Sequence, residues 1–158
     1  MTRESLGRVG LCILALAAHA ALTSCGGSAL DTARSTVATS ARVVAAADSV
    51  AASVIAERIE AADTLDELAL EERHAGKVVR AFVSVHAALT ATDAALDAWA
   101  AGSAEEGTYL DAVACTLPAV LALADALTEY GVGDTVTEPL RVAVGLLSGF
   151  LGGECRAP

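Results

Sequence analysis

The stretch "LALEERHAGKVVRAFVSVHAALTATDAALDAWA", residues Leu68–Ala100, carries the clearest structural pattern in the chain. One set of mostly apolar residues recurs every seven positions, and a second set follows three positions after it. The two sets are Leu68, Ala75, Phe82, Leu89 and Leu96, and Val78, Val85, Thr92 and Trp99. Apolar residues at alternating three- and four-residue steps line one face of an α-helix. The stretch therefore predicts a long helix with one buried face.

The flanking residues predict where this helix begins and ends. Thr64, followed three residues later by Glu67, has the capping-box pattern that starts a helix, and Gly102 is typical of a helix end. A second helical pattern precedes Thr64 and has an expected N-cap at Asp31. We expect the two helices to form a hairpin, because a hairpin buries both apolar faces. One uninterrupted helix over residues 33–102 is the alternative.

A third helix is expected after Gly102. Ser103 and Glu106 repeat the capping-box pattern, and apolar residues then recur on one face. These residues are Leu110, Val113, Leu117, Val120, Ala124 and Leu127. Pro118 lies within the segment, and we expect it to kink or divide the helix because proline has no backbone N–H to donate.

The fourth helix is expected to be capped by Thr137 and to end near residue 151. Its stretch "LRVAVGLLSGFL", residues 140–151, is apolar on every side, and it contains a Gly-x-x-x-Gly spacing that permits close helix packing. Two interpretations stay open: a fully buried helix that packs through its glycines, or a surface for self-association or a protein partner. That surface would comprise Leu140, Val144, Gly145 and Gly149. Residues 31–158 thus predict an all-α, up-and-down four-helix bundle.

The charge of the chain excludes one class of partner. The 158 residues include 10 basic and 20 acidic side chains, which gives a formal net charge of −10 at pH 7. Such an acidic chain repels phosphate backbones and anionic lipid surfaces. Nucleic-acid binding is therefore not expected. The abundance of alanine, the strongest helix former, agrees with the helical interpretation.

The N-terminus has the composition of a secretory signal peptide. Arg3 and Arg8 precede an uncharged, mostly apolar segment of 14 residues, counted from Val9 through Leu22. A helix that spans a membrane needs about 20 apolar residues, whereas a signal peptide has a basic start and a shorter apolar region. An uncleaved N-terminal helix is the alternative, although the glycines after Cys25 would interrupt it.

The end of this segment, Leu22-Thr23-Ser24-Cys25, resembles the lipobox of bacterial lipoproteins. The resemblance covers the first 27 residues and implies cleavage before Cys25 with acyl chains, palmitate among them, on the new N-terminus. Residues 1–24 would then be the signal peptide, 25–30 a lipidated tether and 31–158 the folded domain. The Gly26 that follows the cysteine favours the periplasmic face of the outer membrane. A plain signal peptide with a coincidental cysteine is the alternative.

A disulfide between Cys115 and Cys155 is expected. Both cysteines would lie outside the cytoplasm, where disulfides persist. Cys115 is 15 steps before Tyr130, and Gly152 is 14 steps after Glu138. Because each arm is about 22 Å long as a helix, an antiparallel third and fourth helix would bring the two cysteines together. Two free thiols are the alternative.

No set of residues predicts catalysis, a metal or a cofactor. Glu71 and His74 have the Glu-x-x-His spacing of di-iron bundles, but those proteins use two such motifs, so we expect these two residues to be a solvated pair on the helix surface. His86 lies about 120° from His74 around the helix, so the two cannot share a ligand set without another helix. We therefore expect a non-catalytic, lipid-anchored envelope protein with a structural or partner-binding role. The alternative is a carrier or sensor for a small apolar ligand, which needs a gap around Phe82, Leu89 and Trp99.

The anchoring hypothesis predicts the intact mass of the protein recovered from the membrane fraction. We expect a species that begins at Cys25 and carries added acyl mass, because cleavage and acylation occur at the same residue. Thiol labelling of the unreduced, denatured chain should leave Cys115 and Cys155 unlabelled. A soluble species without acyl groups would contradict the lipoprotein interpretation and would favour a freely secreted binding domain.

Overall fold

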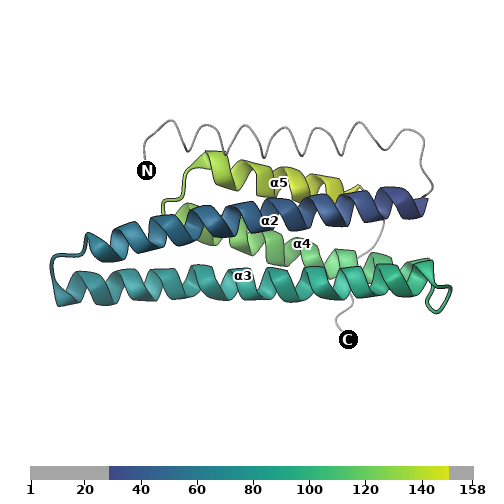
Figure 1. Cartoon of the computed structure of the whole chain (residues 1–158), viewed down its shortest axis with the longest axis horizontal. Helices are drawn as coiled ribbons and strands as arrows, with labels where there is room; N and C mark the ends of the chain where they lie inside the picture. Colours follow the sequence, from purple (N-terminus) through teal and green to yellow (C-terminus); the bar gives the residue numbers. More distant parts are fainter. Residues whose placement is uncertain (1–28, 150–158) are drawn as a thin grey trace.

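The computed structural model describes residues 29–149, which form four helices joined by short connections (Figure 1). The helices are α2 (Ala29–Glu60), α3 (Leu65–Ala100), α4 (Glu106–Glu129) and α5 (Asp134–Ser148). Each helix packs against its neighbours in the chain, and α5 also packs against α2, which closes the ring. The all-α, up-and-down four-helix bundle is therefore confirmed. The break between α2 and α3 also confirms the hairpin over the single long helix.

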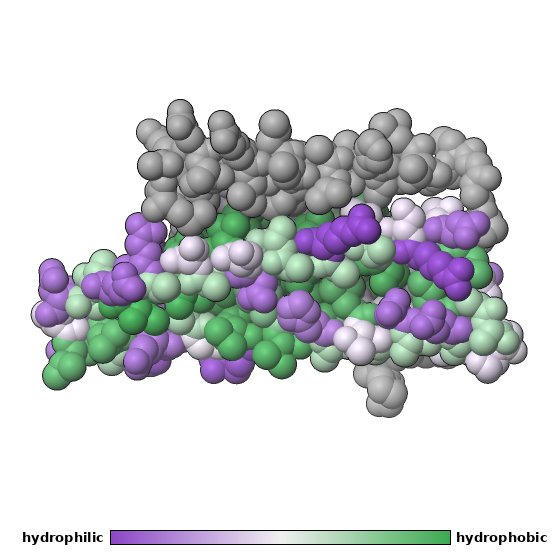
Figure 2. All heavy atoms as spheres, viewed as in Figure 1, coloured by the Kyte–Doolittle hydropathy of each residue, from purple (hydrophilic) through white to green (hydrophobic). Residues whose placement is uncertain are grey.

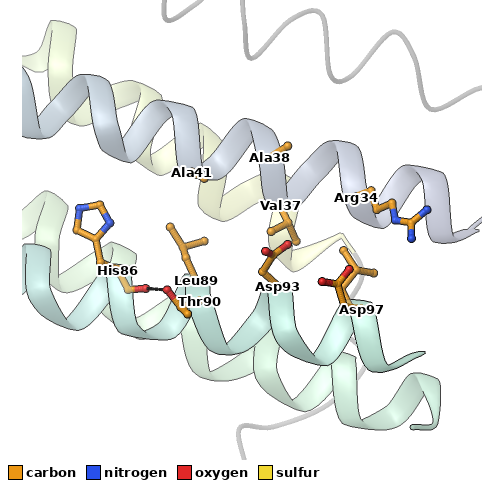
Figure 3. A pocket seen from close by; sticks show the side chains of 10 residues that line it. Arg34, Val37, Ala38, Ala41, His86, Leu89, Thr90, Asp93 and Asp97 are labelled. Carbon is orange, nitrogen blue, oxygen red and sulfur yellow. Dashed lines mark hydrogen bonds between the residues drawn. The ribbon is translucent and has the colours of Figure 1, made fainter. Parts of the chain in front are cut away.

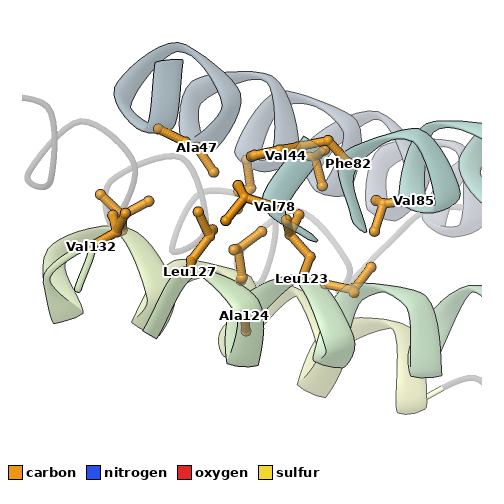
Figure 4. Close-up of a cluster of buried hydrophobic side chains, with 14 of the residues drawn as sticks. Val44, Ala47, Val78, Phe82, Val85, Leu123, Ala124, Leu127 and Val132 are labelled. Atoms are coloured by element: carbon orange, nitrogen blue, oxygen red, sulfur yellow. The ribbon is translucent and has the colours of Figure 1, made fainter. Parts of the chain in front are cut away.

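The periodic stretch on α3 supplies one wall of the core. All seven buried residues of α3 belong to the two predicted sets, and they are Ala75, Val78, Phe82, Val85, Leu89, Thr92 and Leu96. Val78, Phe82 and Val85 lie in one buried cluster with Leu123 and Leu127 of α4 (Figure 4). The α2 side of this cluster is built from small residues such as Val44 and Ala47, so the helices are joined by a compact Ala–Val–Leu core.

One polar pair lies inside this apolar interface. The side-chain oxygens of Thr92 on α3 and Thr116 on α4 are 2.8 Å apart, and either can be the donor. Each hydroxyl also lies 3.0 Å from the backbone carbonyl four residues earlier in its own helix. Both threonines are fully buried. The pair therefore gives each buried hydroxyl a hydrogen-bond partner. Thr92 occupies a position of the seven-residue pattern whose other members are apolar.

Two predicted helix boundaries on α3 are confirmed. The Thr64 hydroxyl accepts a hydrogen bond from the Glu67 backbone at 3.2 Å, and the Glu67 carboxylate accepts one from the Thr64 backbone at 3.1 Å. At the other end Gly102 has a φ of +69°, a conformation that favours glycine. The capping box and the glycine turn thus limit α3 to the expected stretch.

Three other expected boundaries are wrong. Ser103 does not cap α4; its hydroxyl donates to the Ala98 carbonyl, and Glu105 is the N-cap. Thr137 does not cap α5, which begins three residues earlier because Gly133 takes the N-cap position and leaves Thr137 buried. Asp31 lies in the first turn of α2 rather than before it. For α4 and α5 a nearby residue with extended backbone, Glu105 or Gly133, takes the N-cap position that the local pattern assigned to another residue.

Pro118 does not divide α4, which is continuous from Glu106 to Glu129. The proline lies on the exposed side of the helix, so its ring does not enter the core. The expectation of a break is therefore wrong, because packing of the apolar face on both sides of Pro118 holds one helix together.

A second, smaller cluster surrounds Tyr109 near the start of α4. Its buried members are Ala33, Val37, Leu96, Tyr109, Val113 and Leu147. The Trp99 ring stacks on the Tyr109 ring with 5.6 Å between their centroids. Tyr109 is 1% exposed, and within the described residues its hydroxyl has no hydrogen-bond partner. Burial raises the pKa of this hydroxyl to about 12.

Replacing Leu123 by alanine should lower the free energy of unfolding by about 2–5 kcal/mol, because it leaves a cavity in the large core cluster. Leu123 is fully buried, whereas Leu121 on the same helix is 43% exposed. The matched control Leu121→Ala should change stability by no more than about 0.5 kcal/mol. Urea unfolding of both variants provides the measurement, and equal losses would contradict the assignment of the core face of α4.

Tyr109→Phe should leave stability at pH 7 unchanged or slightly raised, because it removes a buried hydroxyl without a partner. The pKa of Tyr109 is raised from 10.0 to about 12 in the folded protein, so ionisation of this hydroxyl opposes folding. The stability that depends on the protonated hydroxyl is fully present below pH 10. That contribution is lost as the pH rises through 12, since the unfolded chain ionises first. Urea unfolding at pH 8 and pH 11 should show a larger decrease for the wild type than for Tyr109→Phe. Equal decreases would contradict it.

Candidate functional site

A groove lies between α2 and α3 on the described surface. It comprises two hollows that both include His86, and we call them together the α2–α3 groove. The polar half encloses about 530 Å³ and is lined in part by Arg34, Ala38, Ala41, Thr90, Asp93 and Asp97 (Figure 3). The apolar half encloses about 510 Å³ and is lined in part by Ile55, Ala56, Ile59, Val79, Phe82 and Val83.

The groove exists because of the residues that α2 places beside α3. The α2 side carries alanines at positions 38, 41, 52 and 56, whose short side chains leave space between the helices. On the α3 side Val79 and Val83 are 53% and 64% exposed, and they lie four residues apart on the same face of the helix. Figure 2 shows apolar surface between the helices in the half of the molecule that carries their connection. The described structure thus leaves part of its apolar surface uncovered.

Charge is distributed unevenly along the groove. Arg34 of α2 lies opposite Asp93 and Asp97 of α3 (Figure 3), and among the described residues no ion pair within 4.0 Å joins them. In the middle of the groove the His86 Nε2 atom is 3.9 Å from the Asp48 carboxylate, and the His86 ring stacks on Phe82. Two carboxylates and one guanidinium therefore line the more polar half, and Asp48 lies beside His86 where the mainly apolar half begins.

The Glu71 and His74 pair does not form a unit. Glu71 lies 3.7 Å from the guanidinium of Arg58 on α2, and that guanidinium stacks over the Tyr130 ring at 4.8 Å. Burial, and then the Glu71 carboxylate, raise the pKa of the Tyr130 hydroxyl. The expectation of a solvated Glu71–His74 surface pair is wrong, because Glu71 is half-buried against a cation from another helix. Sequence spacing could not show this, since α2, α3 and the end of α4 each supply one partner.

The two histidines are not brought together. His74 lines a small hollow with Lys77, Glu129 and Tyr130, whereas His86 lies in the α2–α3 groove. Among residues 29–149 no group of three or more His, Cys, Asp or Glu side chains could hold a metal ion.

The predicted partner surface on the last helix is only partly exposed. Leu140 is fully buried in the core, so the prediction that it belongs to an exposed partner surface is wrong. Val144 is half-buried and packs against the same cluster, whereas Gly145 and Gly149 are exposed. A Cβ atom on Gly145 would meet nothing within 4 Å, so close packing through this glycine is wrong as well. The helix is amphipathic because its bundle position buries only one face; residues 150 and 151 lie outside the description.

The cysteines stay at the level of prediction. Cys25 and Cys155 lie outside the described residues, and Cys115 is half-buried on α4. The lipid anchor and the Cys115–Cys155 disulfide therefore remain to be tested. The single gap around Phe82, Leu89 and Trp99 that the carrier alternative needs is not found in the described residues: Phe82 and Leu89 are buried and line different hollows, and Trp99 packs on Tyr109.

Comparison with known proteins identifies no relative: no family model, no curated protein and no solved structure matches the chain. By length and composition alone, α2 and α4 are each apolar enough to cross a membrane. Core helices of a bundle have the same properties. The site must therefore be interpreted from its own chemistry.

The groove itself was missed at the level of sequence. The signal was present in Val79 and Val83, which are apolar but lie outside the heptad set of α3. These valines form an outward-facing apolar strip on α3, and the alanines form a similar strip on α2. The sequence of either helix alone does not show that the two strips lie side by side.

Proposed function

We propose that this protein is a non-catalytic binding module of the bacterial envelope that engages a protein partner through the α2–α3 groove. The observation that carries the proposal is the exposure of Val79 and Val83 beside Ile55 and Ile59. Exposed apolar side chains that line a groove offer a partner apolar surface to cover. The groove is open along two helices, and such a shape suits a macromolecule better than an enclosed small molecule.

The proposed anchor would place this groove at the membrane. Cys25 precedes the first described helical residue, Ala29, by four residues. Four extended residues span at most about 14 Å, so a lipidated Cys25 would hold the start of α2 near the bilayer. We propose the periplasmic face of the outer membrane as the location, with lipid attachment as the membrane contact.

A second candidate is a carrier or sensor for a small apolar ligand. The apolar half of the groove encloses about 510 Å³ and contains the aromatic ring of Phe82. This volume lies within the range of about 300–1,000 Å³ that is typical of small-molecule sites. Asp48 and His86 would supply the polar contacts of such a site.

Photocrosslinking from the groove tests the proposed function. A photoreactive amino acid replaces Val83 in the full chain in its native envelope, and the same replacement at Leu121 on α4 is the control. We expect a protein adduct of discrete mass from position 83 and none from position 121, because both sites are exposed but only one lines the groove. A lipid or small-molecule adduct would support the second candidate instead. No adduct above the control would contradict both.

A further inference from the structure

We infer that the occupant of the α2–α3 groove is an amphipathic helix with basic residues at the end that meets Asp93 and Asp97. This inference rests on the proposed function, because it gives the chemistry of the partner at the same site. It draws on the length of the groove, the size of its side chains and the sign of its charge.

The length of the groove matches a helix. Its two hollows meet at His86, and together their lining runs from Arg34 to Ile59 on α2 and from Val79 to Asp97 on α3. These are 25 and 18 helical steps, or about 38 Å and 27 Å. A partner helix of about 18–25 residues has that length. A peptide that binds by β-strand addition would need a sheet edge, and the described residues contain no strand.

The side chains of the groove suit helix-on-helix packing. Alanines on α2 permit a close approach, and Val79, Val83 and Ile55 supply larger apolar contacts in the half near the α2–α3 connection. A helix in such a groove uses apolar anchors at positions i, i+3, i+4 and i+7. The partner should therefore carry apolar residues along one face, with the bulkiest ones over the apolar half.

The charge of the groove selects a basic partner. Asp48, Asp93 and Asp97 line the groove, and Arg34 is the one lysine or arginine among its described lining residues. Residues 29–149 as a whole carry 7 basic and 18 acidic side chains, a difference of −11. Such a field attracts cationic partners and repels acidic ones. A second copy of this chain would bring another net negative surface against the groove, so self-association there is disfavoured.

Peptide binding to the purified full chain tests the inference. The probe is a 21-residue helical peptide with leucine and alanine along one face and two lysines at one end, made with the lysines at either end. The matched peptides carry glutamates in place of the lysines. We expect one lysine peptide to bind at least tenfold more tightly than either glutamate peptide at low salt, as measured by fluorescence anisotropy.

Matched variants locate the binding. Val83→Lys should weaken binding of the lysine peptide at least tenfold, whereas Leu121→Lys should leave it unchanged. The double variant D93N/D97N should remove the preference for lysine over glutamate, and D111N/D125N on exposed positions of α4 should retain it. All four variants change exposed residues, and thermal unfolding verifies that each remains folded.

The outcomes separate this inference from the proposed function. Equal binding of lysine and glutamate peptides, with no effect of D93N/D97N, would overturn the basic helix but leave the groove as a binding site. Crosslinks from Val83 to residues 1–28 of the same chain or to a second copy would also overturn it. Absence of both peptide binding and a Val83 adduct would overturn the inference and the proposed function together.

Discussion

Burial of the heptad face of α3 against α4 is the contact on which the rest of the molecule depends. Phe82 and Val85 of α3 belong to the same buried cluster as Leu123 and Leu127 of α4, and the Thr92–Thr116 hydrogen bond also joins these two helices. Because buried apolar area provides most of the stability of a small bundle, this interface sets the position of both helices. The helices α2 and α5 then complete the ring around it.

The unequal lengths of the helices make the two ends of the bundle different. The helices α2 and α3 have 32 and 36 residues, whereas α4 and α5 have 24 and 15. The α2–α3 hairpin therefore extends beyond its partners at the connected end (Figure 1). There the Arg58–Glu71 ion pair and the stacking of Arg58 on Tyr130 join the hairpin to the end of α4. Nearby Ile59 and Val79 line the apolar half of the groove.

Alanine serves two purposes in α2. On the inner face Ala47 and Ala51 let the helix approach the core closely, and each is 1% exposed. On the outer face Ala38 and Ala56 leave the space between α2 and α3 that becomes the groove. A helix with leucines at the outer positions would fill this space with its own side chains. The same composition that makes α2 a good helix thus leaves a surface that can receive another one.

The sequence by itself determined the helices, their order and the core face of α3, because heptad spacing and the Thr64 capping box are local properties of the chain. It also determined the acidic charge and the signal-like N-terminus. The true starts of α4 and α5, the burial of Leu140 and the pairing of Glu71 with Arg58 were decided by tertiary packing. So was the groove, since Val79 and the alanines of α2 become one surface only when two helices lie side by side. Periodicity states which face of a helix is apolar, but not which neighbour covers it.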